Sequence, residues 1–104
     1  MSQMKIVLTT IDNGYKANDI VEILLNERLA ACINTRTIKS HYWWKDKIER
    51  DDEIQLIIKT KANLVDEVIK RIKDLHTYEL PVIEVIDIEK TNEGVEEWLN
   101  KVTK

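Results

Sequence analysis

The chain has 104 residues, of which 43% are hydrophobic and 34% are charged, and its formal net charge is −3. This composition is typical of a folded domain, because a disordered chain would be poorer in apolar residues. The slight negative charge argues against binding to a nucleic-acid backbone, and no apolar run approaches the roughly 18 residues that cross a bilayer. We therefore expect one domain over residues 1–104, with neither nucleic acid nor a membrane as a partner.

The first part of the chain predicts a strand followed by a helix. Residues 5–10 are rich in β-branched and apolar side chains, as a covered strand requires. Asn13 can cap the helix that follows. Apolar side chains then recur at helical spacing and predict a helix that ends near residue 28 or 29. These side chains are Ala17, Ile20, Val21 and Leu24.

A long hairpin is the most unusual predicted element. Residues 31–44 contain neither Gly nor Pro and are dominated by β-branched and aromatic side chains. They predict a strand far longer than the usual about 5–6 residues. Residues 45–47 have turn character, and residues 48–60 return as a second strand. A hairpin of this length is too long for one small domain to cover alone.

The remainder predicts helix, strand and helix. Thr60 is the expected N-cap of a helix that runs to about Leu75, and Pro81 precedes a fourth strand over residues 82–88. Asn92 is the expected cap of a short last helix. The order β-α-β-β-α-β-α predicts the α+β class: a ferredoxin-like sandwich with an antiparallel sheet, both main helices on one face and an extra C-terminal helix.

The other face of this sheet has nothing left in the chain to cover it. Tyr42, Trp43 and Trp44, near the end of the hairpin, are of the aromatic types that are enriched in protein interfaces. We therefore expect a homo-oligomer that forms through the hairpin and the open sheet face, with these three residues in its interface.

His76 is the strongest candidate for a metal-binding or ligand-binding residue. It follows the second predicted helix and shares a short loop with Tyr78 and Glu79, ahead of Pro81. One interpretation is that the helix dipole favours a protonated imidazole there, with no further role. The other is that imidazole, phenol and carboxylate form a corner that binds a small ligand or a metal ion. Both interpretations stay open.

The other chemically interesting residues favour structural roles. Cys32 has no second Cys nearby, so a small buried side chain is favoured over a metal ligand or a reactive thiol, and a lone Cys also favours the cytoplasm. The acidic run from Glu49 to Glu53 favours a solvated strand edge over a divalent-cation site. No Gly-rich phosphate loop and no activated nucleophile stand out, so we do not expect an enzyme.

Five segments are familiar when they are taken together: ERLAACIN at 27–34, YWWKDKIE at 42–49, IKT at 58–60, HTYELP at 76–81 and WL at 98–99. In this order and spacing they resemble the CutA family of divalent-cation tolerance proteins. The resemblance implies ferredoxin-like subunits in a tight trimer similar to the PII signalling proteins. It also implies a link to copper and other divalent cations, and no established catalytic activity.

The resemblance also implies site residues. Family members credited with copper binding carry a Cys where this chain has Thr9 or Thr10, and two adjacent His where it has Leu75 and His76. His76 is therefore the metal ligand that the resemblance transfers to this chain. The residues expected to line a cleft between subunits beside it are Glu53, Lys59, Tyr78 and Glu79.

The expected function is a non-catalytic cytoplasmic homotrimer that binds a divalent cation of the copper type weakly and needs no cofactor to fold. The alternative is a PII-like regulatory or scaffolding trimer that binds a small anionic ligand or a partner protein. In that case Lys59, together with Arg36 or Lys39, would contribute more to ligand binding than His76.

Overall fold

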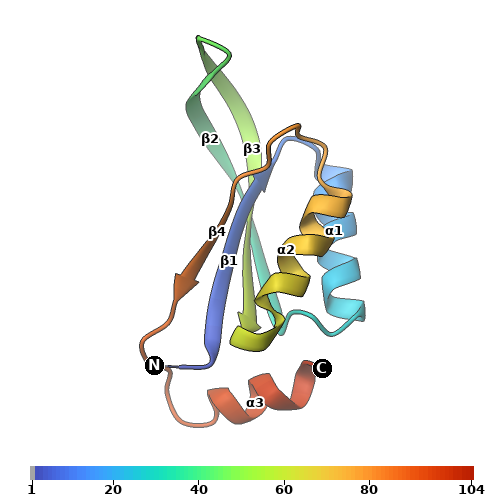
Figure 1. The fold of residues 1–104 in the computed structure, drawn as a ribbon, viewed down its shortest axis with the longest axis vertical. Coiled ribbons are helices and arrows are strands. Elements are labelled where there is room, and N and C mark those ends of the chain that lie inside the picture. The colour runs from blue at the N-terminus through green and yellow to red at the C-terminus, as the bar shows by residue number, and fades with distance from the viewer. Residues whose placement is uncertain (1) are drawn as a thin grey trace.

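The chain folds into a four-stranded antiparallel sheet with two helices packed on one face. The computed structural model describes residues 2–104. The strands are β1 (Met4–Ile11), β2 (Cys32–Trp44), β3 (Lys47–Lys61) and β4 (Ile83–Asp87), in the spatial order β2-β3-β1-β4. The helices are α1 (Gly14–Asn26), α2 (Val65–Leu75) and α3 (Val95–Val102), with a 3-10 turn, η1 (Ala62–Leu64), before α2. The predicted order of elements is confirmed, and α3 lies at the end of the sheet away from the hairpin tip (Figure 1).

The core lies between the sheet and the paired helices α1 and α2. β1 and β3 pair Val7 with Ile58 and Ile11 with Ile54, so all four side chains point to the helix side. The helices meet them with the apolar stripes that the sequence predicted. The buried residues of this core are Val7, Ile11, Ala17, Ile20, Leu24, Leu29, Ala30, Leu56, Ile58, Leu64, Val68 and Ile72.

Only one of the three predicted helix caps forms. The Asn13 carboxamide accepts hydrogen bonds from the backbone of Tyr15 and Lys16 at 2.9 and 3.1 Å, as expected. The prediction for Thr60 is wrong, because Thr60 lies inside β3, and α2 begins only after η1. The prediction for Asn92 is also wrong, because the N-cap of α3 is Gly94, in a left-handed conformation with no side-chain bond.

The long hairpin is confirmed. β2 and β3 pair from Cys32 with Lys59 to Trp44 with Lys47. The two residues between them, Lys45 and Asp46, have φ angles of 49° and 63°, as in a type I′ turn. Figure 1 shows this hairpin projecting well beyond both main helices, and the molecule is 45 Å long as a result.

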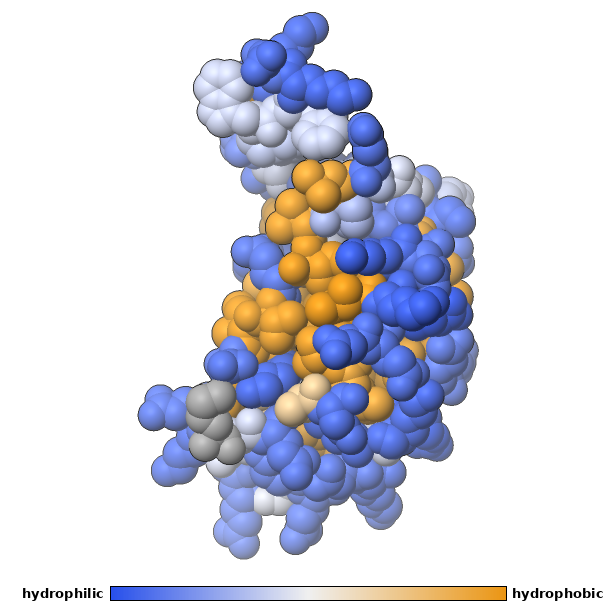
Figure 2. Space-filling view, viewed as in Figure 1, coloured by the Kyte–Doolittle hydropathy of each residue, from blue (hydrophilic) through white to orange (hydrophobic). Residues whose placement is uncertain are grey.

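The sheet face opposite α1 and α2 and the flank along β4 remain open in the single chain. Figure 2 shows a band of apolar side chains over β4 and β1, below the polar hairpin tip. The exposed apolar residues of β4 and the segment before it are Leu80, Val82, Val85 and Ile86. Among residues 2–104, no helix is long and apolar enough to cross a membrane.

Thr60 links β3 to the chain segment after α1, and its substitution tests that link. Its side chain is fully buried, and its hydroxyl donates to the Leu29 carbonyl oxygen at 2.6 Å. Thr60→Val should lower the free energy of unfolding by about 1–3 kcal/mol, because the buried carbonyl loses its donor. Thr35→Val, at an exposed position on β2, is the matched control. Urea unfolding at one protein concentration measures both, and equal losses in the two variants would contradict this role of Thr60.

Candidate functional site

The candidate site lies where the loop after α2 meets the outer part of the hairpin, near its turn. α2 ends at Leu75, and the His76 amide still donates to the Ile72 carbonyl oxygen at 2.8 Å. The chain then turns into an extended loop that returns to the sheet. Its far end is held by Thr9, whose hydroxyl donates to the Val82 carbonyl oxygen at 2.9 Å. The loop is therefore fixed at both ends, and the side chains between them face the hairpin.

The His76 ring holds the loop against β1. Its Nδ1 accepts a hydrogen bond from the Tyr78 amide at 3.1 Å, and its Nε2 lies 2.8 Å from the Thr10 carbonyl oxygen. Because the amide can only donate and the carbonyl can only accept, both bonds form together in the tautomer that carries its proton on Nε2. Both nitrogens are therefore engaged in the single chain, and a metal ion at His76 would have to displace one of these bonds.

Two phenols donate to carboxylates at this site. The Tyr78 hydroxyl donates to Glu53 Oε2 at 2.5 Å, and the Tyr42 hydroxyl donates to Asp51 Oδ2, also at 2.5 Å. Burial, and then the bond to Glu53, raises the pKa of Tyr78 well above its usual value. The bond to Asp51 is the main cause that raises the pKa of Tyr42 to about 12. Glu53 itself is only 5% exposed, so this carboxylate depends on its phenol partner.

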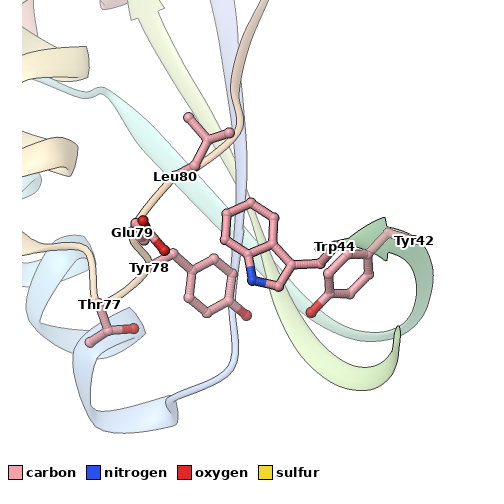
Figure 3. A pocket seen from close by; sticks show the side chains of 6 residues that line it. All are labelled: Tyr42, Trp44, Thr77, Tyr78, Glu79 and Leu80. Atoms are coloured by element: carbon pink, nitrogen blue, oxygen red, sulfur yellow. The ribbon is translucent and has the colours of Figure 1, made fainter. Parts of the chain in front are cut away.

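Between the hairpin and the loop lies a cavity of about 290 Å³, which we call the aromatic pocket. Figure 3 shows Tyr42 and Trp44 reaching it from the hairpin and Tyr78 from the loop. The residues that line it are Tyr42, Trp44, Thr77, Tyr78, Glu79 and Leu80. A second cavity of about 330 Å³ shares four of these residues and adds Thr10, Ser40, Trp43, Glu53 and Val82.

The structure brings most of the predicted site residues together, but not all. Tyr78 and Glu79 line the aromatic pocket with Tyr42 and Trp44, and Glu53 lines the adjoining second cavity, where it accepts the hydrogen bond from Tyr78. Trp43 stands 71% exposed at the tip of the hairpin. Lys59 does not join them within one chain. It lies six residues, about 20 Å, further along β3, where it pairs with Cys32.

Lys59 and Cys32 instead line a separate cavity of about 420 Å³, which we call the lysine pocket. Cys32 is only partly buried, because it lines this open pocket, so the prediction of a buried thiol is wrong. Sequence reasoning missed Lys90 and Trp98, which complete this pocket from the segment after β4 and from α3. No spacing pattern signals them, because their only relation to Lys59 is through the folded chain.

No preformed metal cluster is present in the part of the chain that the structure describes, residues 2–104. No group of three or more His, Cys, Asp and Glu side chains there could hold a metal ion. Divalent metals need several such donors converging on one point. The carboxylates of the site therefore supply negative charge within one chain without a complete coordination shell.

The carboxylate partner of Tyr42 gives a prediction for alkaline pH. A free tyrosine loses its proton near about pH 10, whereas Tyr42 keeps it to about pH 12 in the folded state. The folded state thus holds more protons in this window, so the free energy of unfolding falls as pH rises from about 10 to 12. Asp51→Asn should lower the pKa of Tyr42, measured by phenolate absorbance, and weaken that fall. Asp52→Asn is the control, since Asp52 pairs with Lys39 instead, and an unchanged titration in Asp51→Asn would refute the assignment.

Comparison with known proteins matches nearly the whole chain. The family described as CutA1 divalent ion tolerance protein matches residues 5–102. The divalent-cation tolerance protein CutA of Pyrococcus horikoshii is 45% identical over 101 residues, which span 97% of this chain and 99% of that protein. The CutA of Thermotoga maritima is 37% identical over 98 residues, which span 94% of this chain and 97% of its own.

Solved structures agree with the sequence matches. The crystal structure of CutA1 from Pyrococcus horikoshii superposes with a TM-score of 0.92 at 43% identity, covering 96% of this chain and 98% of that one. The periplasmic divalent cation tolerance protein CutA from Archaeoglobus fulgidus gives a TM-score of 0.93 at 33% identity, covering 97% and 99%. The resemblance inferred from the sequence is thus confirmed, and the chain belongs to the CutA1 divalent ion tolerance family.

Proposed function

We propose that the protein is a non-catalytic cytoplasmic homotrimer that binds divalent cations of the copper type weakly and contributes to metal tolerance. Membership of the family supports this role. The observation that carries it is the negative charge gathered around the aromatic pocket. Glu79 lines this pocket, and Asp51 and Glu53 accept hydrogen bonds from its two phenols and contribute to the raised pKa values of Tyr42 and Tyr78. Such a field attracts cations.

Assembly supports the same proposal. β2 and β4 are the edges of the sheet and leave backbone groups unpaired along their outer sides. The apolar residues exposed along β4 adjoin one of these edges. A second and third copy of the chain would cover both features. Since one chain offers no group of three ligands among residues 2–104, donors from a neighbouring copy would complete the coordination of a bound ion.

Removal of each histidine in turn tests the metal site. His76→Ala should weaken Cu(II) binding about tenfold or more in equilibrium dialysis, because it removes the imidazole that packs against Tyr78, the phenol bonded to Glu53. His41→Ala is the matched control, since His41 is the only other histidine and lies exposed on β2. Glu79→Gln, at a side chain that is 73% exposed, should also weaken binding. Light scattering on the same samples should give three times the 12.3 kDa chain mass.

Two outcomes would contradict the proposal. If the His76→Ala, Glu79→Gln and unaltered proteins bind Cu(II) with equal affinity, a metal site at this loop is excluded. If light scattering gives the mass of a single chain, the trimer is excluded.

The alternative function, binding of a small anion, is favoured by the lysine pocket. Two cations, Lys59 and Lys90, line it, and no carboxylate does. Neither lysine forms an ion pair among residues 2–104. The residues lining the pocket are Met4, Cys32, Lys59, Lys90, Thr91, Asn92, Val95 and Trp98. Arg36 and Lys39, the partners first expected for Lys59, are instead bonded to Gln55 and Asp52.

Cys32 is the only cysteine of the chain and lines this pocket, so its alkylation rate reports on occupancy. With ATP as the anionic probe, alkylation should slow about tenfold at an ATP concentration ten times its dissociation constant. Lys90→Ala should abolish that protection, whereas Lys39→Ala should leave it intact. Protection that survives in Lys90→Ala, or is absent in the unaltered protein, would exclude an anion site at this pocket.

A further inference from the structure

We propose that the aromatic pocket binds an organic ammonium ion, a primary or methylated amine, between its aromatic walls and the Glu79 carboxylate. This ligand is distinct from the divalent cation proposed above, and its binding requires no metal. Three aromatic side chains wall the pocket, and a carboxylate stands among them. The faces of aromatic rings attract cations, and aromatic walls with an acidic group are a common means of binding ammonium ligands.

The chain already places an ammonium group in this environment. Lys45 Nζ lies 5.7 Å from the centroid of the Trp44 ring and 3.6 Å from Glu79 Oε2. The Lys45 ammonium group thus makes the contacts that we propose for the ammonium group of the ligand. Both side chains of this ion pair are more than 70% exposed, so their attraction is weak and a better-placed cation can displace the lysine.

The two phenols at the pocket strengthen the attraction. Tyr42 donates to Asp51, and Tyr78 donates to Glu53, each through a short hydrogen bond. Each carboxylate holds negative charge beside its ring, and the donated bond keeps the electron density of the ring high. A cation entering the pocket therefore meets electron-rich ring faces and the Glu79 carboxylate, while Asp51 and Glu53 add negative charge at the hydroxyl ends of the two phenols.

Within a single chain the shape of the pocket suits an organic cation, whereas a divalent metal ion would need the further donors from a neighbouring copy that are proposed above. Its volume of about 290 Å³ accommodates several carbon atoms, and Leu80 adds an apolar surface for them. A divalent metal would instead need converging oxygen or nitrogen donors, and residues 2–104 offer no such group. The walls match a ligand that carries carbon around its charge.

Choline and its uncharged tert-butyl analogue provide a matched pair of probes. Isothermal titration at constant ionic strength, with EDTA present to remove metals, should show choline binding at least about tenfold more tightly than the analogue. Trp44→Leu and Glu79→Gln should each weaken choline binding about threefold or more. Trp98→Leu is the control, because Trp98 is a partly exposed tryptophan that lines the lysine pocket.

Lys45→Asn gives the sharpest test, because it predicts a gain. Asn accepts the left-handed backbone at this turn position, so the hairpin should persist. With the competing ammonium gone, choline affinity should rise about threefold or more. Equal binding of choline and its analogue, or no gain in Lys45→Asn, would overturn the proposal. Since EDTA is present throughout, these outcomes are independent of whether the metal proposal succeeds.

Discussion

The pairing register of β3 is the constraint on which the rest of the structure depends. Its residues 54–61 pair with β1 and its residues 47–59 pair with β2. Because side chains alternate between faces, this register turns Leu56 and Ile58 toward the helices and Glu53 toward the opposite face. A shift by one residue would bury the carboxylate in the apolar core and expose the two core side chains. The hydrophobic pattern therefore specifies the register, and the register in turn places the acidic end of β3 beside the loop after α2.

Much of this fold could be predicted from local patterns. The absence of Gly and Pro between residues 31 and 44 indicated the long strand, and helical spacing indicated the face of α1 that packs on the sheet. The wrong prediction for Thr60 concerns a residue whose partner is distant in sequence. Thr60 has the chemistry of a helix cap, but its hydroxyl bonds to Leu29, which is 31 residues away. A tertiary bond to a buried carbonyl overrode the local preference, and no sequence window contains both residues.

The residues of the candidate site also fall into two groups: those that lie close together in the sequence and those that only the folded chain brings together. Tyr78 and Glu79 lie in one short loop, so the sequence alone could associate them. Glu53 reaches them across 25 residues, and only the family resemblance pointed to it. Lys59 was associated with the same cleft between subunits; within one chain an extended backbone separates residues 53 and 59 by about 20 Å, so Lys59 would join such a cleft from a neighbouring copy. The lysine pocket could not be predicted at all, because Lys90 and Trp98 reach Lys59 only after the chain segment beyond β4 has folded back.

The energetic balance at the aromatic pocket differs from that of an ordinary surface. A carboxylate as buried as Glu53 costs stability unless it is hydrogen-bonded, and a phenol is a donor that satisfies it without neutralising its charge. An ion pair with Lys or Arg would have neutralised the negative charge of Glu53, whereas the hydrogen bond from Tyr78 leaves that charge in place. Each carboxylate oxygen also keeps lone pairs after accepting one bond, so the group can still receive a cation. Tyr42 and Asp51 repeat the arrangement in the outer part of the hairpin. The fold thus maintains negative charge next to aromatic rings at a point where a hydrophobic pair would be more stable, and cation binding is a function that accounts for this cost.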